Sequence, residues 1–310
     1  MMRKPCLPLL ALVLTAASTA MAQSAAHCPP SEGIALQVLG SGGPIADDGR
    51  ASSGYILWMD GRSRVLIDAG GGTFLRFGEA GARFVDLDFV GLSHFHTDHS
   101  ADFPALLKSG NFSGREAPLV LAGPGPDGRF PGLGTWLDSM LGPGTGAYGY
   151  LSGYLDGSGG LVKLMPREVE LDRGEPTRVL DEDVVIDALA VPHGIVPALG
   201  FRVTAGDVSI VFASDQNGSS DAFVDFASGA SLLVMHLAVP EDATGTALQL
   251  HARPSRIADI AAKAEAGTLV LSHFMARSLH DLDGNVDVVR NGYDGTVLVA
   301  SDLGCVLVPD

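Results

Sequence analysis

The stretch "HFHTDH", residues 94–99, places three histidines and one aspartate within six positions. His94 and His96 are two residues apart, so in an extended segment their side chains point to the same side and can bind one ion. Asp98 and His99 follow on a turn and can reach a second ion beside it. Imidazole nitrogens and carboxylate oxygens are ligands for Zn²⁺, although they also suit Mn²⁺ or Fe²⁺. Two such ions would lower the pKa of a shared water, so this spacing predicts a two-metal hydrolytic site rather than a solvated histidine-rich loop.

The strands that must position such a site stand out because their apolar runs end in polar residues. "LDFVGLSH" leads into the hexapeptide, and "VVIDALAVPH", "VSIVFASD", "SLLVMH" and "GTLVLSH" each end in a histidine or an aspartate. The residues at these five ends are His94, His193, Asp215, His236 and His273. Such strand ends can converge on one edge of a sandwich, and we expect the missing metal ligands among them.

The remaining elements complete the expected layers. "IALQVLG" alternates as a strand, and "GYILWMDGRSRVLIDAG" has two apolar runs separated by Asp60-Gly61, which is a hairpin signal. Helical spacing follows in "DFPALLKSGNF", with Asp102 as the expected cap, and in "RPSRIADIAAKAEAG", with Gly267 as the expected stop. Strand-rich segments that alternate with a few helices predict an α/β fold of two packed sheets with helices outside, a four-layer αββα sandwich.

The pattern His94-x-His96-x-Asp98-His99 resembles the signature of the metallo-β-lactamase-fold hydrolases. The resemblance extends along most of the chain, in order, and is strongest to the ribonuclease Z-like branch, which includes exported arylsulfatases and cyclic-nucleotide phosphodiesterases. "VLGSGGP" and "VLIDAGGG" resemble its opening strands, and "PLVLAGPGP" resembles the strand after the metal motif. "VPHGIVPALGFRV", "IVFASD" and "LVLSHFMAR" resemble the segments that carry its later ligands.

Carried over residue by residue, the resemblance implies two zinc ions. One would be bound by His94, His96 and His193, and the other by Asp98, His99 and His273, with Asp215 bridging both. Asp98 and Asp215 would thus serve catalysis as well as metal binding. Asp68 would lie behind the ligands and orient the loop that carries them. From the residues alone, Asp68 could equally form a turn before the three glycines that follow it.

The chain departs from ribonuclease Z where that enzyme binds RNA and assists its leaving group. "GGPIADDGRASSG" has two acids and only Arg50 in place of a basic loop, and "FRVTAGDVSIVF" turns too tightly for a tRNA-binding arm. His236 and His251 match the two assisting histidines, but Leu237 replaces the glutamate. His251 could act alone as general acid or make a local hydrogen bond at a helix start. His236 could support the ligands or be a core histidine.

Residues 1–22 have the pattern of a cleaved signal peptide, with Arg3 and Lys4, a short apolar run and "AMA" before Gln23. We therefore expect a periplasmic or secreted protein with one domain, residues 23–310, and no stable membrane span. Removing residues 1–22 takes the net charge from −16 to −18, which disfavours nucleic acid as a partner and favours a small-molecule substrate. Cys28 and Cys305 could form a disulfide or remain free thiols. Whether the chain forms a homodimer is left open.

Two further segments invite a functional interpretation. The Gly/Tyr-rich segment 142–160, together with Trp136, could cover the substrate with aromatic rings or could be a long surface loop with partly buried tyrosines. His280 lies in an Asp-rich loop, and we expect it to be a solvated surface residue. "DLDGNVD" lacks the acid that a Ca²⁺ loop carries at its far end.

These observations predict an exported hydrolase that uses two divalent metal ions to cleave a small phosphodiester or sulfate ester. A lactonase, thioesterase or β-lactam hydrolase is an alternative, because all these reactions can use the same activated water. A non-catalytic metal-binding protein is the alternative from another class. The complete set of seven expected ligands argues against that alternative.

Overall fold

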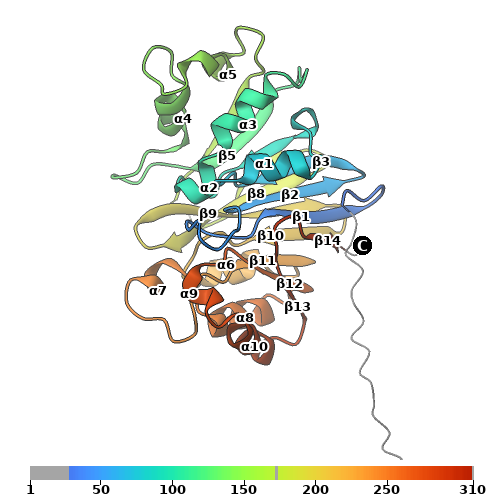
Figure 1. Cartoon of the computed structure of the whole chain (residues 1–310), viewed down its shortest axis with the longest axis vertical. Coiled ribbons are helices and arrows are strands. Elements are labelled where there is room, and N and C mark those ends of the chain that lie inside the picture. The colour runs from blue at the N-terminus through green and yellow to red at the C-terminus, as the bar shows by residue number, and fades with distance from the viewer. Residues whose placement is uncertain (1–27, 172–173, 309–310) are drawn as a thin grey trace, which may run out of the picture.

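Two β-sheets face each other in the computed structural model, which describes residues 28–171 and 174–308 (Figure 1). The first sheet has the strand order β14-β1-β2-β3-β4-β5-β6 and the second has the order β13-β12-β11-β10-β9-β8-β7. The strands of the first sheet are β1 (Ile34–Gly40), β2 (Gly54–Met59), β3 (Arg62–Ile67), β4 (Phe89–Gly91), β5 (Leu119–Pro124), β6 (Leu164–Val169) and β14 (Cys305–Val308). Those of the second are β7 (Thr177–Asp181), β8 (Val185–His193), β9 (Val196–Ala205), β10 (Val208–Phe212), β11 (Leu232–His236), β12 (Thr268–Ser272) and β13 (Thr296–Val299).

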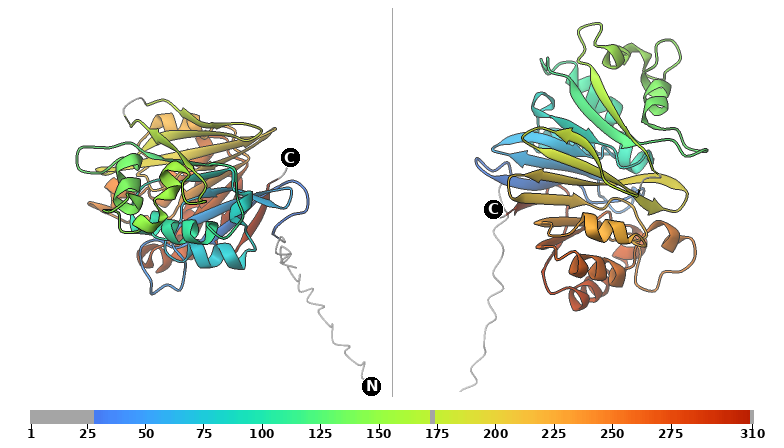
Figure 2. Two further views of the ribbon diagram at one scale, coloured as in Figure 1. Left: turned by 90° about the horizontal axis from the view of Figure 1, so that it is seen from above. Right: turned by 180° about the vertical axis from the view of Figure 1, so that it is seen from behind.

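Helices lie on the outer side of each sheet, as the three views show (Figures 1 and 2). Those associated with the first sheet are α1 (Thr73–Glu79), η1 (Phe84–Asp86), α2 (Thr97–Ser100), α3 (Phe103–Gly110), α4 (Leu133–Leu141), η2 (Gly149–Leu151) and α5 (Gly153–Asp156). Those associated with the second are α6 (Asp221–Phe226), α7 (Ala247–Leu250), α8 (Pro254–Lys263), α9 (Ala276–Leu279) and α10 (Leu282–Gly292). The predicted αββα sandwich is therefore confirmed.

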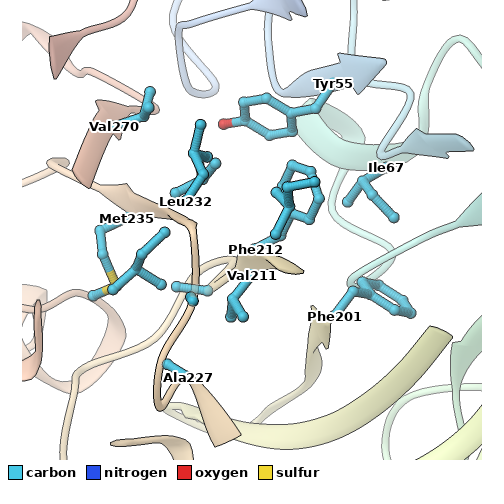
Figure 3. Packing of buried hydrophobic residues seen from close by; sticks show 14 of the residues in the cluster. Tyr55, Ile67, Phe201, Val211, Phe212, Ala227, Leu232, Met235 and Val270 are labelled. Carbon is cyan, nitrogen blue, oxygen red and sulfur yellow. The ribbon is translucent and has the colours of Figure 1, made fainter. Parts of the chain in front are cut away.

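Apolar side chains from both sheets fill the space between them (Figure 3). The ring of Tyr55, from β2, lies 5.5 Å from that of Phe212 on β10. The ring of Phe89, from β4, lies 6.0 Å from that of Phe201 on β9. Fully burying a side chain of this kind contributes about 1.5–3 kcal/mol, so the inner faces of the sheets form a rigid base for the strand ends.

The β2–β3 hairpin turns at Asp60 and Gly61, as predicted, and both residues have positive φ, 49° and 75°. Of the two expected helix ends, one is confirmed and one is wrong. Asp102 is the N-cap residue of α3, as predicted, but its carboxylate makes no capping bond to that helix; instead it accepts from the backbone N–H of Gly72 and Phe74 at the start of α1. Helix α8 ends before Gly267, because Glu265 takes the left-handed conformation, with φ 51°.

Parallel pairing brings the polar strand ends of the second sheet to one edge. β10, β11 and β12 are parallel neighbours, so the residues that follow their carboxyl ends lie side by side. β3 and β4 are parallel neighbours in the first sheet and deliver Asp68 and His94 in the same way. The antiparallel hairpin of β8 and β9 contributes His193, at the end of β8.

A disulfide joins Cys28 to Cys305 on β14, with their Cα atoms 5.9 Å apart. Of the two alternatives for these cysteines, the structure has the bridge. It fastens the chain near Cys28 to the edge of the first sheet, where β14 pairs with β1. Among the described helices, none combines the length and the apolar character needed to cross a bilayer. The expected signal peptide lies outside the described residues.

Candidate metal centre

All seven expected ligands lie together where the strand ends of the two sheets meet. Together they form two of the three groups of described side chains able to hold a metal ion, within each of which the ligand atoms lie within 4.8 Å of one another; the third group is Asp215, His236 and His273. The first group is His94, His96, His193 and Asp215, and the second is Asp98, His99 and His273. Every member is buried except His96, which is half-buried and reaches a cavity. The grouping coincides with the division into two ions that the resemblance implies.

Two of the histidines are held at Nδ1 and direct Nε2 into the centre. Nδ1 of His193 lies 2.9 Å from the carbonyl oxygen of Leu250, so this nitrogen donates and Nε2 keeps a free lone pair. That buried Nε2 has no hydrogen-bond partner among the described residues. Nδ1 of His94 lies 3.1 Å from Ser93 Oγ, leaving Nε2 to face His96 Nδ1 at 3.0 Å. A buried imidazole with an unpartnered, inward lone pair is what a divalent cation requires, so the residues present fit a metal.

Asp215 occupies the middle of the cluster. Its Oδ2 lies 3.6 Å from His193 Nε2 and 3.7 Å from His99 Nε2, on either side. Its Oδ1 lies 3.4 Å from His273 Nε2. A carboxylate in this place can contact both ligand groups, which is the position that a bridging ligand must have.

Electrostatics keep the acids of the centre ionised. Burial alone would raise the pKa of Asp215, but His273, His251 and His99 outweigh it and hold that pKa well below its usual value. Burial likewise acts against ionisation of Asp98, whereas its hydrogen bond with His273 and the nearby His99 lower its pKa to about 2. Both carboxylates are therefore anionic at neutral pH and can neutralise cationic charge.

Buried histidines respond in opposite ways to this environment. Burial, followed by the proximity of His99, lowers the pKa of His94 well below its ordinary value, so the ring is neutral and available as a ligand. Burial would do the same to His99, but Asp68 and Asp215 raise its pKa well above the ordinary value. The site around His99 thus favours positive charge, which a proton or a metal ion can supply.

Asp68 lies behind the ligand loop and contacts it three times. Its Oδ1 accepts from the backbone N–H of Ser93 at 2.7 Å, and its Oδ2 accepts from Ser93 Oγ at 2.9 Å. The same Oδ2 lies 2.7 Å from Nδ1 of His99. Asp68 has a φ of 59°, in the left-handed region. Such strain persists only where the surroundings over-determine it, so this aspartate is a fixed part of the centre rather than a free turn residue.

His236 and His251 both direct Nδ1 toward Oδ1 of Asp215, at different distances. Nδ1 of His236 lies 2.7 Å from Asp215 Oδ1, so His236 contacts an expected ligand and is more than a core residue. Burial, followed by His273, lowers the pKa of His236 to about 4. Nδ1 of His251 lies 3.7 Å from Asp215 Oδ1, beyond hydrogen-bond distance, and has no partner among the described residues. Burial lowers the pKa of His251 to about 3, so its ring is neutral at neutral pH.

A cavity of about 590 Å³ opens onto the cluster. It is lined by His96, Asp98, His193, Asp215, His251 and His273, and by Pro44, Phe95, Thr97, Leu250, Met275 and Arg277. Among these residues Arg277 is the only arginine or lysine. Its Nε donates to the carbonyl of Ala238 at 2.8 Å, which fixes a positive charge at the wall of the cavity.

The Gly/Tyr-rich segment 142–160 contributes no residue to this cavity, so its interpretation as an aromatic cover is wrong. Tyr154 is buried and its hydroxyl donates to the carbonyl of Leu107 at 2.6 Å. Tyr148 and Tyr150 are exposed. The alternative, a surface segment with partly buried tyrosines, describes it correctly. The ring of Trp136 does not line the cavity, but it stacks on the ring of Phe95, which does; the two ring centroids are 4.8 Å apart.

His280 is exposed, as expected. "DLDGNVD" forms the start of α10 rather than a cation loop, and the carboxylate of Asp281 accepts from the N–H of Gly284 as an N-cap. The sequence analysis did not identify Ser93, Arg277 or Tyr55, whose polar groups contact Asp68, the cavity or His236. Each adjoins a recognised motif or lies in a predicted strand. Their residue types alone, however, do not indicate a contact with a metal centre until the fold is known.

The comparisons with known proteins agree with this geometry. The family model of the metallo-beta-lactamase superfamily matches residues 47–273. Ribonuclease Z of Mycobacterium marinum (strain ATCC BAA-535 / M) is 29% identical over 255 residues, covering 78% of this chain and 86% of that protein. Ribonuclease Z of Mycobacterium sp. (strain KMS) is 31% identical over 259 residues, covering 78% and 84%.

Among solved structures, the short form of human tRNase Z has the same fold. The two superpose with a TM-score of 0.68 at 20% sequence identity, covering 89% of this chain and 100% of that chain. The family match spans most of the described residues and contains all seven clustered ligands. The chain therefore belongs to the metallo-beta-lactamase superfamily of metal-dependent hydrolases, and ribonuclease Z proteins are among its relatives there.

Proposed function

We propose that this chain is an exported two-metal hydrolase of a small phosphodiester or sulfate ester. The observation that carries the proposal is the buried double cluster around Asp215, which opens onto a cavity with one fixed guanidinium. Under the proposal, His94, His96 and His193 hold one ion, Asp98, His99 and His273 hold the other, and Asp215 contacts both. Two bound divalent ions supply an activated water and positive charge to stabilise the transition state. Imidazole and carboxylate ligands favour zinc, with Mn²⁺ or Fe²⁺ as alternatives.

Two side chains at the cavity, Arg277 and His251, would then bind the substrate and contact its leaving group. Arg277 binds an anionic oxygen of the substrate, because a guanidinium pairs well with phosphate and sulfate oxygens. His251, neutral and without a partner on Nδ1, faces the substrate and donates a hydrogen bond toward the leaving group. Neutral lactones and thioesters make no use of Arg277, which is why we place anionic esters first.

We also propose that the protein works outside the cytoplasm. The signal-like pattern of residues 1–22 supports this, and so does the Cys28–Cys305 bridge, because disulfides persist mainly in oxidising compartments.

A second candidate substrate is RNA, favoured by the name ribonuclease Z that the relatives carry. Two features of this chain count against it. The net charge is −16, which repels a polyanion. The β9–β10 connection consists of Gly206 and Asp207 alone, which leaves no arm at the position of the tRNA-binding arm.

A substrate panel tests the proposal directly. Purified protein loaded with Zn²⁺ is assayed on bis-p-nitrophenyl phosphate, p-nitrophenyl sulfate, a lactone, a β-lactam and a precursor tRNA. We expect turnover of the phosphodiester or the sulfate ester, and no cleavage of the tRNA. His96→Ala should remove that turnover without unfolding the protein, whereas His280→Ala, a change of an exposed histidine, should leave it intact. Cleavage of the tRNA alone would show that RNA is the substrate instead. If no substrate in the panel is turned over, the proposed function is wrong.

A further inference from the structure

We propose that Tyr55 is a positioning residue of the metal centre, which holds His236 against Asp215 and His273. The inference rests on the proposed metal site but concerns a residue outside the ligand set. Tyr55 lies on β2, in the first sheet, whereas His236 and Ser272 end two adjacent strands of the second sheet. The tyrosine hydroxyl therefore connects the first sheet to two strand ends of the second sheet.

Both ring nitrogens of His236 are engaged. Nδ1 lies 2.7 Å from Asp215 Oδ1, and a carboxylate can only accept, so Nδ1 carries a proton. Nε2 lies 3.2 Å from the hydroxyl of Tyr55, and this hydroxyl lies 3.0 Å from Ser272 Oγ. With both nitrogens held, the ring cannot turn about its Cβ–Cγ bond without losing two buried hydrogen bonds.

The ring held in this way touches two expected ligands. Besides its bond to Asp215, it stacks on His273, with centroids 4.5 Å apart and planes inclined by 14°. His273 has a φ of 54°, in the left-handed region, where a residue other than glycine is strained. A strained ligand keeps its place only if its neighbours hold it. The ring of His236 is one such neighbour, and its hydrogen bond with Tyr55 holds it in place.

The environment of Tyr55 shows that packing alone does not explain its hydroxyl. The residue is fully buried, and its ring lies beside Phe212 in the apolar layer between the sheets (Figure 3). In such a place a phenylalanine would fill the same space without a polar atom to satisfy. A buried hydroxyl costs free energy unless it is hydrogen-bonded, and the hydroxyl of Tyr55 has His236 and Ser272 as its partners.

The test is the affinity of the protein for Zn²⁺, measured by competition with a chelating dye, for wild type and Tyr55→Phe. Partners that orient metal ligands typically contribute about 10–100-fold to metal affinity or activity, so we expect a loss in that range for at least one of the two ions. Tyr154→Phe is the matched control, because it also removes a buried hydroxyl that makes one hydrogen bond, to Leu107, away from the cavity. It should leave Zn²⁺ affinity unchanged.

A double-mutant cycle separates positioning from a general loss of stability. In the His236→Ala background, where there is no ring to hold, Tyr55→Phe should cause no further loss of Zn²⁺ affinity. An equal loss in both backgrounds would overturn the inference, as would wild-type affinity in Tyr55→Phe. A wild-type protein that binds no Zn²⁺ would instead overturn the proposed function together with this inference.

Discussion

Asp68 Oδ2 lies 2.7 Å from Nδ1 of His99, and the same carboxylate holds the backbone N–H and the hydroxyl of Ser93. One buried acid thus orients a ligand ring and anchors the start of the ligand loop. Neither contact can be replaced by water, because Asp68 is only 1% exposed. The precision of the centre depends on this relationship.

Asp68→Asn should weaken the centre without dismantling the fold. The carboxylate accepts from Ser93 N–H, Ser93 Oγ and His99 Nδ1. An amide nitrogen accepts no hydrogen bond, so at least one of these buried donors is left unpaired. We expect Zn²⁺ affinity or kcat to fall about 10–100-fold. Asp102→Asn is the control, since Asp102 caps α1. Because asparagine caps a helix about as well as aspartate, this change should leave both the unfolding free energy and the Zn²⁺ affinity almost unchanged; equal effects of both changes on metal binding would refute the assignment.

Gly43→Ala should displace His273. A Cβ at residue 43 would lie 2.9 Å from Cε1 of the His273 ring, closer than such contacts allow, while the backbone at Gly43 is not in the left-handed region. The expected result is weaker Zn²⁺ binding, measured by dye competition. Gly78→Ala offers the contrast, because nothing lies within 4 Å of its added methyl in helix α1. That change should raise stability by about 0.4–1 kcal/mol and leave metal binding alone.

Arg277→Met should raise KM for the anionic ester while changing kcat little. A lost hydrogen bond between charged groups typically costs about 1.5–3 kcal/mol, or roughly a 10–150-fold rise in KM. A neutral ester should be hydrolysed equally well by both proteins. Arg290→Met removes an exposed guanidinium on α10 and should have no effect. If KM for the anionic ester does not change, Arg277 does not contact the substrate.

Removing metal should lower the melting temperature. Ligands that bind only the folded state stabilise it, by about 2.7 kcal/mol at a concentration 100 times Kd. For a chain of this size that corresponds to a decrease on the order of 5 °C or more per site on adding a chelator. Calorimetry of the Zn²⁺-loaded and chelated protein measures the change, and His96→Ala should show a smaller one. Identical melting curves in the two conditions would argue against tight metal binding.

Replacing both bridged cysteines, Cys28→Ser with Cys305→Ser, should reduce the unfolding free energy by about 2–5 kcal/mol. The bridge closes a loop with a sequence separation of 277 residues, so it restricts the unfolded chain strongly. Denaturant unfolding with and without reductant checks this. The wild type should become less stable on reduction and the double variant should not respond. A wild type that is insensitive to reductant would mean that the bridge contributes nothing.

The sequence by itself determined the metal-binding motif and the architecture. Ligand types and the two-residue spacing of His94 and His96 define a metal motif locally, and apolar runs that end in polar residues identify the strands. Both patterns are properties of a few neighbouring residues, so they can be read without coordinates. For the same reason the β2–β3 hairpin was predicted at Asp60-Gly61.

Only the tertiary structure decided what depends on contacts between distant segments. The carboxylate of Asp102 bonds to the start of α1 rather than to its own helix, because side-chain partners are set by packing rather than by sequence position. Segment 142–160 lies away from the cavity for the same reason. Tyr55 and His236 are 181 residues apart and meet only because two sheets face each other. Arg277 gains meaning in the same way, as the single guanidinium that the fold places at the wall of the described cavity.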